Sequence, residues 1–199
     1  MDPLEPMGVV PVTLRNDHVT LEPLSLDHAA DIAQALDDEV FRYMPMRSSV
    51  RTPSEVQRYI QSQLARPNAL AFAVIDHASG RCVGSTSYMN IRTEHRGLEI
   101  GSTWISAASR GTKINPSMKL LMLGHAFETL GAIRVELRTD ARNAQSRAAI
   151  EKLGAVFEGL LRVHMVMSDG HLRDTALYSI TRDEWPGTRE SLKNRVLSE

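Results

Sequence analysis

Cysteine, net charge and long apolar runs are all scarce in this sequence of 199 residues. Cys82 is the single cysteine, which excludes an internal disulfide and a metal cluster built from cysteines, and which favours a reducing cytoplasm. A net charge of −1 argues against a general nucleic-acid or membrane-surface binder. No stretch reaches the roughly 18 consecutive apolar residues of a membrane span, and the first residues lack the basic region of a secretion signal. We therefore expect a soluble, single-domain protein.

The hydrophobic patterns predict strands and helices in mixed order. We expect strands over residues 19–24, 69–76, 82–91, 98–106, 133–137, 157–167 and 172–180, and helices over 25–36, 52–66, 116–130 and 143–153. Three prolines in residues 1–18 predict an extended arm that covers an edge or a partner subunit. Residues 19–185 form the expected domain, and residues 186–199 a charged tail that frays. The seven histidines lack ligand spacing, so no metal site is expected.

A polar loop at residues 110–113 gathers groups that bind anions. It follows a predicted strand and precedes a helix, for which Asn115 is the expected N-cap and Pro116 the first residue. Backbone N–H groups and two cations at the positive end of a helix dipole hold phosphate. Residues 110–147 carry seven bases against three acids, as a polyanionic ligand requires, although a solvated helix face would show the same excess.

Four short motifs in one order resemble the GCN5-related N-acetyltransferases (the GNAT superfamily), and within them the ribosomal-protein N-terminal acetyltransferases of the RimJ/RimL type. The motifs are Leu98-Glu-Ile-Gly101, the Arg110-Gly111 loop, Asn143-x-x-Ser146 and Lys152-Leu-Gly-Ala-Val-Phe-Glu-Gly159. The resemblance covers about residues 17–185. It implies an α+β fold with a mostly antiparallel sheet of six to seven strands, a central splayed parallel pair and about four helices.

The same resemblance implies acetyl-CoA as cosubstrate and assigns residues to it. The cofactor-binding set is Trp104, Ile105, Ser106, Arg110, Gly111, Thr112, Lys113, Ile114, Asn115, Asn143 and Ser146. A backbone N–H near Ile105 is the candidate oxyanion donor. Lys113 and Asn115 stand where the family pattern has small residues. Because lysine resists the positive φ that glycine allows, we expect Lys113 to weaken cofactor binding or to contact the diphosphate as a point charge.

Two residues are the candidate catalytic groups. Glu99 lies on the strand 98–105, where burial would raise its pKa and let it accept the amine's proton through water. The alternative is a solvent-facing residue paired with Arg96 or Arg110. Ser146 is the candidate proton donor to the leaving thiolate, with Tyr88 or Tyr178 as substitutes if either reaches the cleft.

The predicted reaction is acetyl transfer to a primary amine, with a protein or peptide N-terminus as the favoured acceptor. Two alternatives stay open: acetylation of a small amine such as a polyamine, amino acid or antibiotic, and a non-catalytic acyl-CoA-binding module. No nucleic acid or membrane partner is expected. The proline-rich arm and the final hairpin could both support a homodimer.

Overall fold

A single eight-stranded sheet forms the centre of the computed structural model, which describes residues 5–37, 39–44 and 52–197. The strands are β1 (Leu14–Arg15), β2 (Val19–Pro23), β3 (Leu70–Asp76), β4 (Arg81–Arg92), β5 (Gly97–Ile105), β6 (Arg134–Asp140), β7 (Val156–Val166) and β8 (Leu172–Thr181). The α-helices are α1 (Ala29–Ala35), α2 (Pro53–Leu64), α3 (Ile114–Gly124), α4 (Ala144–Lys152) and α5 (Trp185–Leu197). The strand order is β1-β2-β3-β4-β5-β6-β8-β7, and every neighbouring pair except β5–β6 is antiparallel. The predicted mixed fold is confirmed, with one strand and one helix more than expected.

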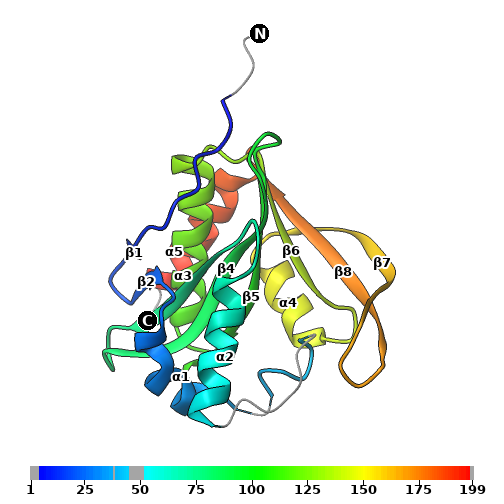
Figure 1. The fold of residues 1–199 in the computed structure, drawn as a ribbon. Coiled ribbons are helices and arrows are strands. Elements are labelled where there is room, and N and C mark those ends of the chain that lie inside the picture. Colours follow the sequence, from blue (N-terminus) through cyan, green and yellow to red (C-terminus); the bar gives the residue numbers. More distant parts are fainter. Residues whose placement is uncertain (1–4, 38, 45–51, 198–199) are drawn as a thin grey trace.

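Two hydrophobic clusters cover the two faces of the sheet. One unites strand residues such as Leu98 and Val135 with side chains of α3, α4 and α5. The other unites the opposite face of β3 to β5 with α1 and α2, and includes Trp104. Figure 1 shows α3 beside α5 and α1 beside α2. A side chain on β5 therefore faces either the α3 side or the α2 side. The alternation shifts at Ser102, which has φ +52°, so that Ile100 belongs to the first cluster and Trp104 to the second.

Helix starts follow local capping chemistry. Thr52 caps α2 in a capping box with Glu55, and Pro53 is the first helical residue, as the sequence predicts. Ser25 caps a short 3₁₀ helix (η1, Leu26–His28) that leads into α1. The predicted start of α3 is wrong: Asn115 lies inside the first turn and does not cap it. Instead, the helix begins at Ile114, whose N–H donates to Thr112 Oγ1 at 3.3 Å.

The first and last described segments of the chain pack against the domain. Met7 is 3% exposed and belongs to the core cluster with α3, and its N–H donates to Thr93 O. The N-terminal segment thus covers its own molecule from residue 7 onward. The expectation of a fraying tail is wrong, because residues 185–197 form α5, whose Leu192 is 1% exposed. The division of the chain into arm, domain and tail stays a prediction.

Candidate active site

Strands β5 and β6 separate part-way along their length. Their parallel pairing comprises Gly97–Arg134, Leu98–Val135 and Glu99–Glu136. Beyond Glu99, β5 continues to Ile105 and β6 to Asp140, and β6 pairs with β8 over its whole length. This gap is the splayed parallel pair that the resemblance predicted.

One main-chain amide of β5 is placed to serve this gap. The Ser106 N–H donates to Val83 O of β4 at 2.8 Å, and Ser106 O accepts from Ser109 N at 3.0 Å. Successive residues of a strand direct their N–H groups to alternate sides, so the Ile105 N–H points away from β4 and toward the gap. The main chain of Ser106 is therefore committed elsewhere, whereas Ile105 keeps the geometry of the predicted oxyanion donor. The Trp104 side chain lies on the α2 side, where its Nε1 donates to Tyr59 Oη at 2.8 Å.

Glu99 is buried at the point where the strands part. Its exposed fraction is 5%, and Leu98 and Ile100 on either side face the α3 cluster, so Glu99 faces the opposite side of the sheet. Oε2 accepts from Asn90 Nδ2 at 2.7 Å and lies 3.4 Å from Arg138 Nε. Desolvation raises the pKa of Glu99, and Arg138 and Asn90 oppose this rise.

The alternative for Glu99, a solvent-facing residue paired with Arg96 or Arg110, is wrong, because Glu99 is buried and contacts neither arginine in the described residues. Arg96 donates to backbone oxygens of Leu130 and Gly131, and Arg110 Nη2 donates to Asp37 Oδ2 at 2.7 Å. The sequence analysis missed Asn90 and Arg138. The sequence did contain a signal for Arg138. It lies two residues after Glu136 on β6, so the two share a face of the sheet, and β6 lies beside the strand that carries Glu99.

The anion loop contains one left-handed residue, Gly111, with φ +78°. Lys113 has φ −70° and ψ −9°, so the backbone strain expected at Lys113 is absent. The N–H groups of Gly111 and Lys113 donate to no acceptor in the described ranges. They stand directly before α3, where an anion is favoured by the helix dipole.

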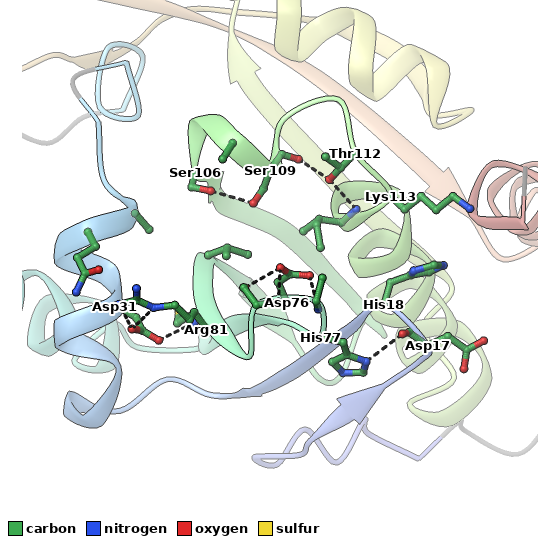
Figure 2. A pocket seen from close by; sticks show the side chains of 18 residues that line it. Asp17, His18, Asp31, Asp76, His77, Arg81, Ser106, Ser109, Thr112 and Lys113 are labelled. Atoms are coloured by element: carbon green, nitrogen blue, oxygen red, sulfur yellow. Dashed lines mark hydrogen bonds and ion pairs between the residues drawn. The ribbon is translucent and has the colours of Figure 1, made fainter. Parts of the chain in front are cut away.

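A cavity of about 870 Å³ lies beside this loop, and Figure 2 shows the side chains that line it. Ser106, Ser109 and Thr112 reach it from the loop, and Thr112 Oγ1 donates to Ser109 O at 2.7 Å. Asp31 and Arg81, which pair at 2.8 Å, line the other side. Glu99, Asn143 and Ser146 do not line this cavity, so it lies outside the gap in which the candidate catalytic groups stand.

Asn143 and Ser146 stand at the start of α4. Asn143 is the N-cap, and its Oδ1 accepts from Ser146 N at 3.0 Å. Because α4 packs into the same cluster as α3, Ser146 and Glu99 approach the gap from opposite faces of the sheet. Tyr88 and Tyr178, the substitutes considered for Ser146, stay predictions, and both of their phenol groups are hydrogen-bonded. Tyr88 Oη donates to Met122 O, and Tyr178 Oη lies between Arg147 and Glu151.

The closing hairpin offers no ligand cluster. Asp174 Oδ1 accepts from Val163 N at 2.7 Å, and His164 Nδ1 lies 3.1 Å from Thr175 Oγ1. Both contacts join β7 to β8. Within the described ranges, no group of three or more metal-ligating side chains is found, and no helix there is long and apolar enough to span a membrane.

Comparison with known proteins decides the family, since the model of the "Acetyltransferase (GNAT) domain" matches residues 18–156. The chain belongs to the GNAT family. This GNAT protein is 26% identical over 181 residues to the Bacillus subtilis (strain 168) protein described as "Putative ribosomal N-acetyltransferase YdaF", covering 87% of this chain and 97% of the relative. We conclude that it is an N-acetyltransferase.

Solved structures agree with this fold. A GCN5-related N-acetyltransferase from Brucella melitensis is 28% identical, with a TM-score of 0.91 over 97% of this chain and 89% of the other. Mycobacterium smegmatis RimJ in complex with CoA-disulfide is 24% identical, with a TM-score of 0.77 over 96% of this chain and 98% of the other. The second likeness supports the fold alone.

The gap and the loop of this GNAT protein suit an acyl-CoA. The unpaired stretch of β5 offers a main-chain edge to an extended arm, and a side chain added at Gly111 would meet no atom within 4 Å. Two free amides and the start of α3 provide for a diphosphate. Arg110 is held by Asp37, so its part in cofactor binding stays a prediction, as do those of the other cofactor-binding candidates.

Proposed function

We propose that this enzyme transfers the acetyl group of acetyl-CoA to a primary amine, with the N-terminal α-amine of a protein or peptide as acceptor. The observation that carries the proposal is Glu99, a carboxylate buried where β5 and β6 part. The likeness to the Bacillus subtilis relative, which is described as a ribosomal N-acetyltransferase, supports a ribosomal protein as the acceptor. The cytoplasmic location is part of the same proposal and rests on the single cysteine, which is buried.

Glu99 would accept the amine's proton through a water molecule. A raised pKa makes a carboxylate a stronger base, and desolvation raises the pKa of Glu99 while Arg138 and Asn90 oppose the rise. The acceptor would approach from the α2 side of the sheet, which Glu99 faces. The acetyl-CoA arm would lie along β5 on the side of α3 and α4, with its carbonyl oxygen near the Ile105 N–H.

Replacing Glu99 with glutamine tests the proposal. Glu99→Gln keeps the shape and the Asn90 contact region but removes the base, so we expect kcat to fall roughly 10²–10⁴-fold at neutral pH. The affinity for CoA should change little. Thiol release with an N-terminal peptide as acceptor measures kcat, and calorimetry measures CoA binding. The matched control is Glu94→Gln, at an exposed turn residue, which should behave as wild type.

The same assay separates the competing functions. Thiol release with N-terminal peptides but not with diamines, amino acids or aminoglycosides supports the proposed acceptor. Release with one of the small amines alone would favour a small-molecule acetyltransferase. Thermal stabilisation by acetyl-CoA without release from any amine would favour a non-catalytic acyl-CoA module. Full activity of Glu99→Gln would remove Glu99 from the mechanism and leave the family assignment intact.

We also propose that the enzyme is a homodimer joined at β7. This strand is a sheet edge, and five of its apolar side chains are 47–70% exposed: Val156, Phe157, Leu160, Val163 and Val166. Two antiparallel copies centred on Leu160 would set Glu158 of each opposite Arg162 of the other. Apolar surface and opposite charges on one edge suit a second copy of the same strand.

A further inference from the structure

Lys119 is buried, unlike the other three lysines of the chain. It lies in the second turn of α3 and is 8% exposed. Its Nζ donates to Thr103 Oγ1 at 3.4 Å. An ammonium has three N–H donors, and no carboxylate contributes to the electrostatics of this one in the described part of the chain. Burial of an ammonium without a counter-ion costs free energy. A ligand that accepts its hydrogen bonds would therefore stabilise the charged form of Lys119.

The contact with Thr103 places this amine at the gap. Thr103 lies beyond Glu99, the last β5 residue that pairs with β6. It is two residues before Ile105, about 7 Å along a strand. Thr86 Oγ1 lies 2.8 Å from Thr103 Oγ1, and Met122 of α3 contacts Thr86, so Lys119 approaches from the α3 side. Glu99 approaches from the opposite side.

We propose that Lys119 is a further catalytic residue, which donates a proton to the coenzyme A sulfur as the acceptor amine displaces it. This inference rests on the proposed function. The amine nitrogen bonds to the acetyl carbon, and the carbon–sulfur bond breaks with its electron pair on sulfur. Sulfur takes the proton from Nζ, and the neutral Lys119 amine regains one from solvent. The proton that the acceptor amine loses leaves through Glu99 on the other face.

The surroundings of Lys119 suit this role. Burial lowers its pKa to about 8, and a donor that titrates near the working pH transfers protons efficiently. The amine donates to the hydroxyl of Thr103, which in turn lies 2.8 Å from that of Thr86. No charged group of β1, β2, β4, β5 or α5 contributes to the lowering within the described residues. Among the other candidate donors, Tyr88 and Tyr178 are hydrogen-bonded within the core, and Ser146 is a hydroxyl whose ordinary pKa lies far above the working pH.

The pH dependence of Lys119→Met tests the proposal. Methionine has a similar length and removes an uncompensated buried charge, so we expect the variant to fold. Wild-type kcat should decline above about pH 8, where the ammonium is lost. In Lys119→Met, kcat at pH 7.5 should fall roughly 10²-fold, and the decline above pH 8 should disappear. Lys193→Met, at a lysine on α5 paired with Glu190, is the control and should match wild type.

A second measurement does not need turnover. With ¹³Cε-labelled lysine, the NMR signal that is missing from Lys119→Met should titrate near pH 8 and shift when CoA saturates the wild-type enzyme. A signal that titrates above pH 10 or ignores CoA would overturn the proposal, as would wild-type kcat of Lys119→Met at every pH. If wild type releases no thiol with any amine, the proposed function fails, and the NMR titration still decides whether Lys119 contacts the cofactor.

Discussion

Within the loop that precedes α3, Gly111 alone has a left-handed backbone, with φ +78°. Glycine adopts this conformation without steric cost, whereas a residue with a Cβ does not. Lys113 nearby has a right-handed helical backbone that any residue adopts. The chain therefore turns at Gly111 and leaves the amides before α3 directed outward.

Gly111→Ala should strain this turn. A Cβ at Gly111 meets no neighbour within 4 Å, so the effect comes from φ alone and amounts to about 1 kcal/mol of the free energy of unfolding. For a chain of this size we expect a Tm lower by roughly 2–4 °C, with weaker CoA binding. Calorimetry measures both. Gly8→Ala, where φ is ordinary and no atom is close, should change neither; an unchanged Gly111→Ala would show that the turn adapts.

At single positions, the sequence predicted which chemical groups matter better than it predicted the contacts that those groups make. Glu99 was correctly expected to be buried, because apolar residues flank it in a strand. Lys119 was grouped with the basic residues of the anion site, since its helix is apolar on several sides and gives no sign of which residues meet Thr103. The contacts of Arg96 and Arg110 could not be predicted, because their acceptors lie 34 and 73 residues away in the chain.

The strands β6, β8 and β7 are held together by one ion pair as well as by their ladders. Arg134 of β6 reaches across β8 to Glu158 of β7, with nitrogen–oxygen distances of 2.6 and 2.5 Å. Ser179 of β8 donates to the same carboxylate at 2.7 Å. The hydrogen bonds from Arg134 contribute most to lowering the pKa of Glu158 to about 2.

This pKa predicts how stability depends on pH. A carboxylate with a lower pKa in the folded than in the unfolded state stabilises the fold above its unfolded value. The contribution of Glu158 should be complete above about pH 4.5 and lost as the pH falls toward 2. Glu158→Gln should therefore have a lower Tm than wild type at pH 7, and the difference should shrink below pH 4.5. Calorimetry from pH 2 to 7 measures it, and a difference independent of pH would contradict the assignment.

Helices and strands with strong local signals were predicted well, and those without were not. Thr52, Pro53 and Glu55 mark α2 by capping chemistry alone. The helix α5 was missed because Pro186 and Gly187 lie near its start and because its few buried residues, Trp185, Thr188 and Leu192, are widely spaced. Its burial comes from packing on α3. The start of α3 was expected at Asn115 and Pro116 but lies at Ile114. The Ile114 N–H donates to Thr112 in the preceding loop, and the N-cap pattern did not include this residue.

For the molecule as a whole, the order of elements along the chain was enough to predict the fold class. A helix between two strands favours a parallel crossover, and this gave the β5–β6 pair. The position of β7 at the sheet edge, beyond β8, could not be derived from its hairpin alone. The resemblance also implies that the connector at residues 41–46 contributes to the acceptor pocket, and residues 45 and 46 lie outside the described ranges.

The homodimer is tested at the β7 edge. Leu160→Asp places a charge opposite itself in the proposed pairing, so we expect a monomer where wild type is a dimer. Light scattering after size-exclusion chromatography measures the mass. Val10→Asp alters another exposed apolar residue, on the N-terminal segment, and should leave the mass unchanged. A wild-type monomer at micromolar concentration would refute the dimer.

The early end of the β5–β6 ladder leaves the main chain of β5 beyond Glu99 without a strand partner on the β6 side. An extended molecule with its own amide groups can pair with this main chain, whereas a compact ligand of equal polarity cannot. The main chain of β5 therefore selects an extended acyl donor. Side chains along β5 can vary without changing which kind of molecule binds.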